Sequence, residues 1–576
     1  MTITAEPDTG TGARRAWAAG PWPLVAACAL QVAVRLLPSW GRDFPLIHPD
    51  EPGYLLAARW LAGGPGTDFT GMPFYQGGYP LLLAPAYWVT DDPGRVYSIV
   101  LVVNALVGAL LFPLARAVLL RCGVRPGPAS VISWVAALLP ATTLYGGLAM
   151  SDAVLPVIVL GWLLAADRFV RCGTLGPALL ASAPAAYSVT VHARGTIVLL
   201  VHAVLLAAMA ARGPARRVAL IAGAATGAAC GAALAFNAWV SGALYPGGSF
   251  DLGSTMQDRL TSPSGLLRTV TAASGQLWAM STGTWGLGAV GLIVAVAVLF
   301  RRSSPQPDRI AAALLLATTA GITLASTAAL PDEHRVGNFA YGRYIACLSL
   351  VYALVGLAAL LRRAASARLV AGAIGLMFAL GGWLLLYLGE RIDTYAVSFY
   401  DFPEIGPLGG SYLELRPLVI SASAGALLLV LYGLLRWGTP KLAAALLVLN
   451  VSLTLVPSSV WRFVEETMPP SALPRTTGGV AIERHAAELD LVEPEPQLVY
   501  SRLANAVWWT GLQQFDPAQG PPPGVCTVIV SWPAGVQAAE TWPQRPPGWR
   551  YQRSGALGAL WWVVWYDPAC PSGAAQ

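Results

Sequence analysis

The acidic residues best placed for chemistry lie in one short motif, HPDEPGY at residues 48–54. In this motif two adjacent carboxylates, Asp50 and Glu51, precede Tyr54. Two neighbouring negative charges beside an apolar block repel each other and are costly to desolvate, so the pair needs a proton or a cation. The motif is therefore suited to accepting a proton or to holding a metal ion. In the alternative interpretation, Asp50 only caps the helix that Pro52 begins.

Two arginine-containing segments have the composition of a phosphate-binding site. VTVHARGT carries His192 and Arg194, and PDEHRVGNFAYGRY carries Arg335 and Arg343. The planar fork of an arginine matches the oxygens of a phosphate, which favours this chemistry. Arg343 is the first candidate because it almost immediately precedes an apolar block, and Arg194 is the second. In the alternative, arginines at such positions only reach out to lipid phosphates.

A third carboxylate and two rings extend this predicted site. Asp152 lies in AMSDAVL, where Ser151 and Asp152 would otherwise suit a helix cap. Tyr341 and Tyr344 lie on either side of Arg343, and their rings would form a wall for a sugar or a prenyl chain.

Histidines beside acids raise the question of a metal. His48 stands close to Asp50 and Glu51, and His334 follows two further acids at residues 332–333. Such groups would bind a divalent cation, Mg, Mn or Ca, which neutralises a phosphate. Spacing in the sequence does not establish that the two clusters meet, so it does not decide whether a metal ion binds.

The elements that must position these residues are membrane helices. Of the 576 residues, 55% are hydrophobic and 11% are charged, against roughly a quarter charged in a soluble domain. Apolar blocks such as 96–120 are long enough to cross about 30 Å of hydrocarbon. The net charge of +6 does not indicate nucleic acid, because the basic residues form short clusters between apolar blocks. The chain is therefore predicted to be an all-α, multi-pass protein of the plasma membrane.

Apolar windows of about 20 residues predict about thirteen spans. They lie near residues 21–38, 95–121, 128–147, 153–170, 177–191, 196–211, 218–240, 282–300, 310–330, 344–361, 369–388, 417–435 and 442–460.

The charges between these spans predict their orientation. With a cytoplasmic N-terminus, every inner loop is basic, whereas the outer loops hold most of the acids. The inner basic residues lie at 121–125, 168–171, 212–217, 301–302, 362–363 and 436–441.

Three outer segments, 39–94, 241–281 and 389–416, are too long to be mere connectors. In the first we expect an amphipathic helix at 51–61 and a membrane-surface segment at 79–88, where Pro80 and Pro85 interrupt a spanning helix.

Hydropathy falls after the last span, which divides the chain into a membrane domain, 1–460, and a small extracytoplasmic mixed α/β domain, 461–576. Strands are predicted at 497–502, 526–532 and 560–566, and helices near 479–491 and 504–514. Cys526 and Cys570 both lie in this outer domain, so they are candidates for a disulfide.

The acidic motif in the first outer loop, with its tyrosine and the Tyr-Pro-Leu segment that follows, resembles a known group. It is similar to that of protein O-mannosyltransferases and of the aminoarabinose transferases of lipid A, both members of the GT-C superfamily. At the level of topology the resemblance covers the whole chain, and at the level of motifs about the first third. The chain has GGYPLL at 77–82 in place of the Lys-Pro-Pro-Leu run of the lipid A enzymes, which leaves the sugar and the acceptor open.

The resemblance implies transfer of a sugar, with inversion, from a polyprenyl-phosphate donor to a glycan, lipid or protein acceptor of the cell envelope. It implies that Asp50 deprotonates or orients the acceptor hydroxyl with support from Glu51, and that Asp152 matches a second acidic position. Independently of any family, such a transfer needs a base near the acceptor and positive charge around the departing phosphate. The candidates for binding phosphate are Arg194, Arg343, Arg335 and His192, and those for binding sugar or acceptor are Tyr54, Tyr341 and Tyr344.

Two other functions compete with this interpretation. A transporter or flippase of lipid-linked glycan would show paired repeats with polar groups at mid-membrane, whereas here the ionisable residues gather at one face. A non-catalytic scaffold would bind glycan through aromatics of the outer domain, such as Trp508 and Trp509. Truncation after residue 460 would separate the scaffold from the enzyme.

Overall fold

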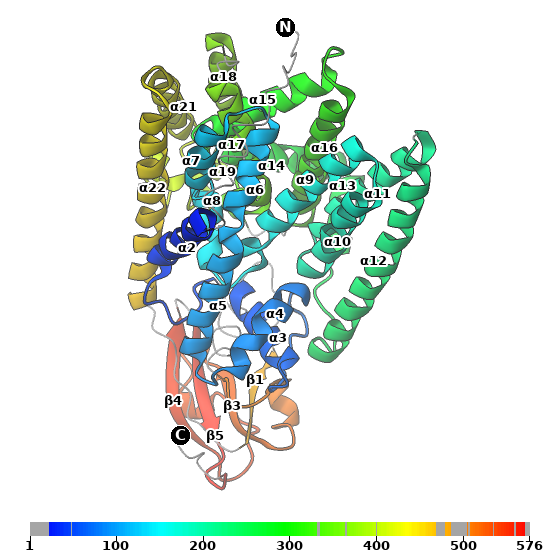
Figure 1. The fold of residues 1–576 in the computed structure, drawn as a ribbon. Coiled ribbons are helices and arrows are strands. Elements are labelled where there is room, and N and C mark those ends of the chain that lie inside the picture. The colour runs from blue at the N-terminus through cyan, green and yellow to red at the C-terminus, as the bar shows by residue number, and fades with distance from the viewer. Residues whose placement is uncertain are drawn as a thin grey trace.

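The computed structural model describes residues 22–47, 49–212, 214–330, 334–362, 366–398, 400–467, 478–484, 504, 507–533, 535–557 and 560–570. Most of them form a bundle of long helices, and a five-stranded sheet lies at one end of the bundle (Figure 1).

Within the described residues, eight helical segments are long and apolar enough to cross a membrane. Two further pairs of helices bent at a short break bring the number of candidate spans to as many as ten. The chain is therefore an integral, mostly helical membrane protein. The eight segments contain α2 (Trp22–Leu36), α5 (Pro93–Ala109) with α6 (Leu111–Arg121), α12 (Arg216–Leu244), α16 (Gln306–Ala329), α17 (Ala346–Leu361), α18 (Ala367–Leu388), α21 (Pro417–Leu434) and α22 (Thr439–Thr467).

Three of the predicted spans are helices that fall outside this set. They are α9 (Leu155–Cys172), α10 (Leu175–Val191) and α11 (Gly195–Arg212). The last turns of α9 carry three charges, and the apolar stretches of α10 and α11 are shorter than 18 residues. The candidate spans thus number eight to ten, against the thirteen expected from apolar windows.

One predicted outer loop is largely helical. Segment 241–281 contains α13 (Leu252–Thr261) and most of α14 (Pro263–Thr282), which bends by 116° into α15 (Leu287–Phe300). Polar side chains lower the hydropathy of α14, yet several of them, including Thr269 and Gln276, are buried inside the bundle. Trp278 of α14 donates a hydrogen bond to Ser421 at 2.9 Å. Helix–helix packing therefore accommodates a segment that hydropathy assigns to water.

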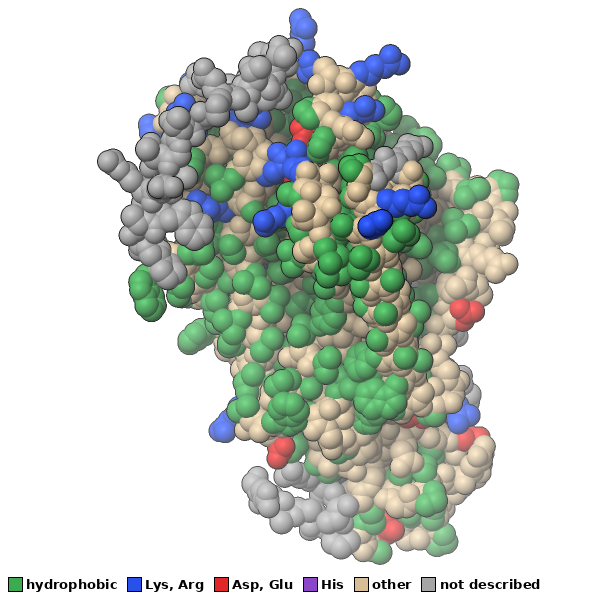
Figure 2. Space-filling model, turned by 45° about the vertical axis from the view of Figure 1, so that its right-hand side comes forward, with side chains coloured by type: hydrophobic (Ala, Val, Ile, Leu, Met, Phe, Trp, Pro, Cys, Tyr) green, Lys and Arg blue, Asp and Glu red, His purple; other side chains and the backbone are tan. Residues whose placement is uncertain are grey.

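The charges of the bundle are polarised along its axis. Figure 2 shows most Lys and Arg side chains at the end away from the sheet, with hydrophobic side chains covering the middle. At that basic end, Arg121 forms ion pairs with Asp167 at 2.9 Å and Asp308 at 2.8 Å. This arrangement agrees with the predicted separation of basic and acidic loops.

The first predicted outer segment, 39–94, folds into α3 (Asp50–Leu61), α4 (Gly78–Leu83) and the 3₁₀ turn η2 (Ala84–Trp88). The predicted helix at 51–61 is α3, but it is buried from Glu51 to Arg59 rather than amphipathic. The reason is that the bundle covers one side of α3 and the C-terminal sheet covers another (Figure 1).

The sheet has the strand order β2-β1-β3-β5-β4. β1 pairs in parallel with β2 and β3, whereas β5 is antiparallel to β3 and β4. Cys526 at the start of β3 is joined by a disulfide to Cys570, with Cα atoms 6.0 Å apart. The strands are β1 (Gly479–Glu483), β2 (Leu512–Phe515), β3 (Val525–Ser531), β4 (Arg550–Leu557) and β5 (Leu560–Tyr566).

The strands predicted at 526–532 and 560–566 are confirmed as β3 and β5. The predicted helix at 479–491 is wrong over β1, because an internal strand of a mixed sheet is buried on both faces and loses the alternation typical of a strand. The predicted helix at 504–514 is wrong where β2 begins at Leu512. The strand predicted at 497–502 lies outside the described residues.

Candidate active site

Asp50 is held at the N-terminus of α3 by two partners from distant segments. Its carboxylate accepts a hydrogen bond from Arg343 Nη1 at 2.6 Å and one from the Tyr75 hydroxyl at 3.1 Å. The Tyr75 ring reaches this position because Gly53 faces it, where a β-carbon would collide with the ring. Asp50 makes no capping hydrogen bond to its helix, and 26% of its side chain is exposed. The carboxylate is thus aimed at Arg343 and open to a ligand.

Asp152 ties the two candidate arginines together. It lies in the turn η4 (Ser151–Ala153) and accepts hydrogen bonds from Arg194 Nη2 at 2.6 Å and Arg343 Nε at 2.9 Å. Burial alone would raise the pKa of Asp152, but the two guanidinium groups outweigh burial and hold its pKa below the usual value. Asp152 is therefore a buried anion that orients both arginines, and it makes no capping hydrogen bond.

Arg194 lies between α10 and α11 and is fixed on several sides. Its Nη1 donates to the carbonyl oxygen of Tyr344 at 3.0 Å, and its guanidinium lies 5.1 Å from the centre of the Tyr344 ring. His192 Nδ1 accepts from the backbone N–H of Arg194 at 3.1 Å. Burial and the adjacent Arg194 charge lower the pKa of His192 well below its usual value. His192 is thus a neutral residue that orients Arg194 rather than a second cation.

Glu51, although adjacent to Asp50, points elsewhere. Successive side chains on a helix diverge by about 100°, and the Glu51 carboxylate accepts four hydrogen bonds inside the protein. The donors are the Leu46 and Ile47 amides at 2.8 Å, the Tyr97 hydroxyl at 2.6 Å and the Ala149 amide at 2.7 Å. Burial raises the pKa of Glu51 and these hydrogen bonds oppose the increase. Glu51 therefore stabilises the loop that precedes Asp50.

The predicted tyrosines border the cluster. The Tyr54 hydroxyl lies 2.9 Å from Ser151 Oγ, next to Asp152. The Tyr341 hydroxyl accepts a hydrogen bond from Arg343 Nη1 at 3.3 Å, and the Tyr341 and Tyr344 ring centres are 5.0 Å apart.

Arg335 lies at the edge of the cluster, where it forms an ion pair with Asp401 and its guanidinium lies 5.9 Å from the centre of the Tyr341 ring. His334 packs against the Tyr395 ring with centres 5.3 Å apart. His48 and the acids at 332–333 lie outside the described residues. Within the described part of the chain, no group of three or more His, Cys, Asp or Glu residues is arranged to hold a metal ion. The described metal candidates Asp50, Glu51 and His334 do not converge on one point.

Sequence reasoning assigned no role to Glu404, which lies behind Arg343. Its carboxylate is buried and accepts a hydrogen bond from the Tyr145 hydroxyl at 2.8 Å. It packs against Gly342 of the turn η6 (Gly342–Ile345), where a β-carbon would collide with the carboxylate. Burial raises the pKa of Glu404 to about 7. The available signal was an acid between apolar residues in DFPEIGP together with the glycine before Arg343.

This architecture has a counterpart among solved structures. No protein family matches the chain by sequence, and no curated protein does so either. The crystal structure of ArnT from Cupriavidus metallidurans bound to undecaprenyl phosphate is similar over 96% of this chain and 100% of that one, with a TM-score of 0.51 and 15% sequence identity. The chain has the fold of the GT-C glycosyltransferases.

Two other structures with the GT-C fold show the same likeness at lower scores. The apo state of ArnT from Cupriavidus metallidurans gives a TM-score of 0.48 at 15% identity, over 96% of this chain and 99% of that one. Arabinosyltransferase EmbB from Mycobacterium smegmatis gives 0.45 at 16% identity, over 78% of this chain and 41% of that one.

Proposed function

We propose that this protein is a membrane glycosyltransferase that transfers a sugar from a polyprenyl-phosphate donor to an acceptor hydroxyl at the outer face of the membrane. One observation carries the proposal. Asp50, the partly exposed carboxylate, shares Arg343 with the buried anion Asp152, and Asp152 also holds Arg194. A candidate base and two arginines, whose guanidinium groups are suited to binding phosphate, therefore lie in one cluster.

In the proposed reaction the acceptor hydroxyl gives its proton to Asp50 while its oxygen bonds to the anomeric carbon of the donor sugar. The bond between that carbon and the phosphate oxygen breaks, and its electron pair leaves with the polyprenyl phosphate. Arg343 and Arg194 stabilise the negative charge that grows on the leaving phosphate. Because the acceptor attacks from the side opposite the phosphate, the anomeric configuration is inverted.

Arg343 has a nitrogen available for the phosphate. Nε and Nη1 donate to Asp152, Asp50 and Tyr341, whereas Nη2 makes no hydrogen bond to any described residue. We assign the contact with the donor phosphate to Nη2. Undecaprenyl phosphate is the ligand of the similar ArnT structure, which supports a polyprenyl phosphate as the donor carrier. The rings of Tyr54, Tyr341 and Tyr344 are then placed to border the sugar.

The proposed topology has thirteen crossings, with α9, α10 and α11 crossing in addition to the candidate spans. The N-terminus is then cytoplasmic, and the Asp50 cluster lies at the outer boundary. The C-terminal sheet domain is extracytoplasmic, where the Cys526–Cys570 disulfide is expected to persist. In this arrangement the basic end of the bundle faces the cytoplasm.

The test is transfer of radiolabelled sugar from polyprenyl phosphate to isolated cell envelopes by the purified protein in lipid nanodiscs. Asp50→Asn is expected to lower kcat by about 10²–10⁴-fold, the usual contribution of a general base. Asp393→Asn, at an exposed carboxylate of α19 (Arg391–Thr394), is the matched control and should change kcat less than about twofold. Translocation of the lipid-linked sugar without transfer would instead identify a transporter.

A further inference from the structure

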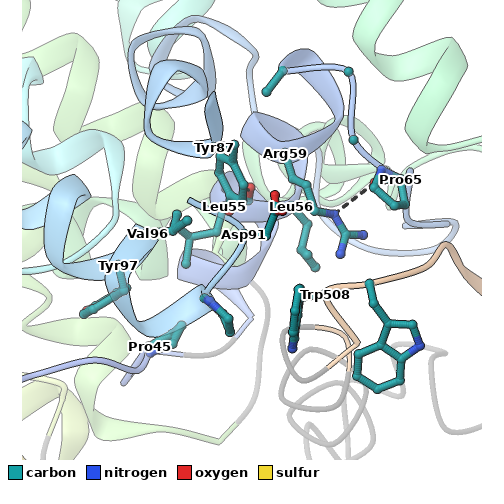
Figure 3. A pocket seen from close by; sticks show the side chains of 15 residues that line it. Pro45, Leu55, Leu56, Arg59, Pro65, Tyr87, Asp91, Val96, Tyr97 and Trp508 are labelled. Atoms are coloured by element: carbon teal, nitrogen blue, oxygen red, sulfur yellow. Dashed lines mark hydrogen bonds between the residues drawn. The ribbon is translucent and has the colours of Figure 1, made fainter. Parts of the chain in front are cut away.

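A cavity of about 430 Å³ is lined by residues of the membrane bundle and of the C-terminal domain. Figure 3 shows Trp508 facing the side of α3 that carries Leu56 and Arg59. Tyr87, Asp91 and Tyr97 complete the polar and aromatic lining. The C-terminal domain contributes Trp508 and Trp509 to the lining, and it forms one hydrophobic core with the first predicted outer segment.

The docking that closes this cavity is specific. Arg59 Nη1 donates to the Val507 carbonyl oxygen at 2.8 Å, and the Asp68 amide donates to the Leu512 carbonyl oxygen at 3.0 Å. Two polar backbone contacts and a shared apolar core therefore hold Trp508, next in sequence to Val507, in position beside α3.

Aromatic rings give this cavity flat apolar walls. The hydroxyl groups of the two tyrosines are used inside the protein, because Tyr87 donates to the Leu55 carbonyl oxygen at 2.7 Å and Tyr97 donates to Glu51 at 2.6 Å. The Tyr97 side chain is buried, so it is the half-buried Tyr87 that offers mainly carbon surface to a ligand. The indoles of Trp508 and Trp509 are partly exposed and lie edge to face, with ring centres 6.1 Å apart.

Charged groups stand beside these walls in fixed or exposed positions. The Arg59 guanidinium is oriented by the Pro65 carbonyl oxygen at 3.0 Å and the Thr67 hydroxyl at 3.1 Å, in addition to Val507. Asp91 lies at the rim and is exposed. Flat aromatic surface with a few oriented polar groups suits a sugar, whose ring has apolar C–H faces and a circumference of hydroxyls.

The cavity lies on the same helix as the proposed base. Asp50 begins α3 and Arg59 lies nine residues further on, about two and a half turns and about 14 Å along the helix axis, so the two side chains leave opposite faces of the helix. Tyr97 connects the two places, since it lines the cavity while its hydroxyl holds Glu51. A ligand that occupies the cavity and reaches Asp50 must therefore be longer than one sugar ring and must extend around α3.

We infer that this cavity binds a glycan chain, and that this chain is the part of the acceptor remote from the hydroxyl that receives the sugar. The role of the glycan as the acceptor rests on the proposed function, whereas the binding of the glycan to the cavity does not. The acceptor is then an oligosaccharide or polysaccharide of the envelope rather than a single sugar, a lipid without glycan or an unmodified protein.

Binding is tested directly in protein that cannot carry out transfer. The probe is the water-soluble glycan released from isolated envelopes of the source cells, fluorescently labelled and titrated against Asp50→Asn protein in nanodiscs. We expect saturable binding, weakened about tenfold or more by the additional change Trp508→Ala and about threefold or more by Asp91→Asn. The matched control is Trp561→Ala, at an exposed tryptophan of β5 outside the cavity, which should bind as the parent does.

The outcomes separate the two proposals. If binding depends on Trp508 and Asp91 but the wild-type protein transfers no sugar, the glycan site is supported and the proposed glycosyltransferase activity is wrong. Absence of binding, or equal binding by the Trp508 and Trp561 variants, would overturn the glycan site. Asp91→Asn changes only the rim, so it keeps the test valid if Trp508→Ala proves to unfold the outer domain, which its thermal unfolding profile would reveal.

Discussion

Nη1 of Arg343 lies 2.6 Å from Oδ2 of Asp50, although 293 residues separate them in the chain. The carboxylate lies at the start of α3, and the guanidinium comes from the turn before α17. Their contact is the connection through which the proposed base and the proposed phosphate site become one centre.

Replacing Arg343 by lysine should remove most of the transfer activity. A lysine ammonium cannot reproduce the fork that holds Asp152 through Nε and Asp50 through Nη1 while offering Nη2 to the phosphate. We expect kcat/KM for the donor to fall by about 10²–10³-fold, the range for loss of one preorganised donor to a developing anion. The measurement is initial-rate transfer at varied donor concentration. Arg416→Lys, in an exposed ion pair with Glu414, is the control and should retain the wild-type value.

Asp152→Asn should destabilise the fold and also lower the transfer activity. The change leaves Arg194 and Arg343 with less negative charge in a buried site, and breaking a buried ion pair costs about 3–5 kcal/mol. Thermal unfolding in detergent, followed by tryptophan fluorescence, should show a clear decrease in midpoint. The exposed counterpart, Glu414→Gln, should cost less than about 1 kcal/mol. Equal midpoints for these two variants would contradict the buried role of Asp152.

The raised pKa of Glu404 predicts that the folded state loses stability as the pH rises. Its pKa is raised from 4.5 to about 7 by burial, so the folded state binds the proton more tightly than the unfolded state does. The stabilisation is complete below the unfolded pKa and is lost as the pH rises through the folded pKa. The shift corresponds to about 3 kcal/mol.

The measurement is the free energy of unfolding at several values of pH for wild type and Glu404→Gln. The wild-type value should fall relative to that of Glu404→Gln between about pH 4.5 and about pH 7. Glu390→Gln, at an exposed carboxylate in the same outer segment, should follow the wild type. Parallel curves for wild type and Glu404→Gln would show that the pKa of Glu404 is the same in the folded and unfolded states.

Thiol labelling checks the proposed thirteen crossings. Cys172 is an exposed free cysteine at the end of α9, and the proposed topology places it in the cytoplasm. In intact cells it should resist a membrane-impermeant maleimide and react only after lysis. In protein with Cys172→Ser, a cysteine introduced at the exposed Ser254 of α13 should react in intact cells. Labelling of Cys172 from outside would mean that α9 does not cross as proposed.

Much of the fold follows from local sequence because lipid restricts what the chain can do. In lipid, long apolar blocks can satisfy their backbone polar groups only as helices. The helical bundle could therefore be predicted without knowing which segments pack against one another. β3 and β5 were equally predictable, because each is a short run of β-branched and aromatic residues. Local composition failed at α14 and β1, where packing by the rest of the molecule overrides the local pattern.

The types of the site residues were also evident from sequence. Asp50, Asp152, Arg194 and Arg343 are ionisable groups next to apolar blocks, where a charge is costly unless it has a partner. Sequence could not say which partner each of them has.

Only the tertiary structure decided how these groups divide the work. In the fold, Asp50 points toward Arg343 and Glu51 points into the protein. The two directions differ by the rotation of about 100° between neighbouring residues of a helix, and the sequence of two adjacent acids does not say which of them faces Arg343. The tertiary structure also placed Glu404 behind Gly342 and Trp508 beside α3. The physical reason is that residue type determines what a side chain can bind, whereas its partner depends on the packing of segments hundreds of residues apart.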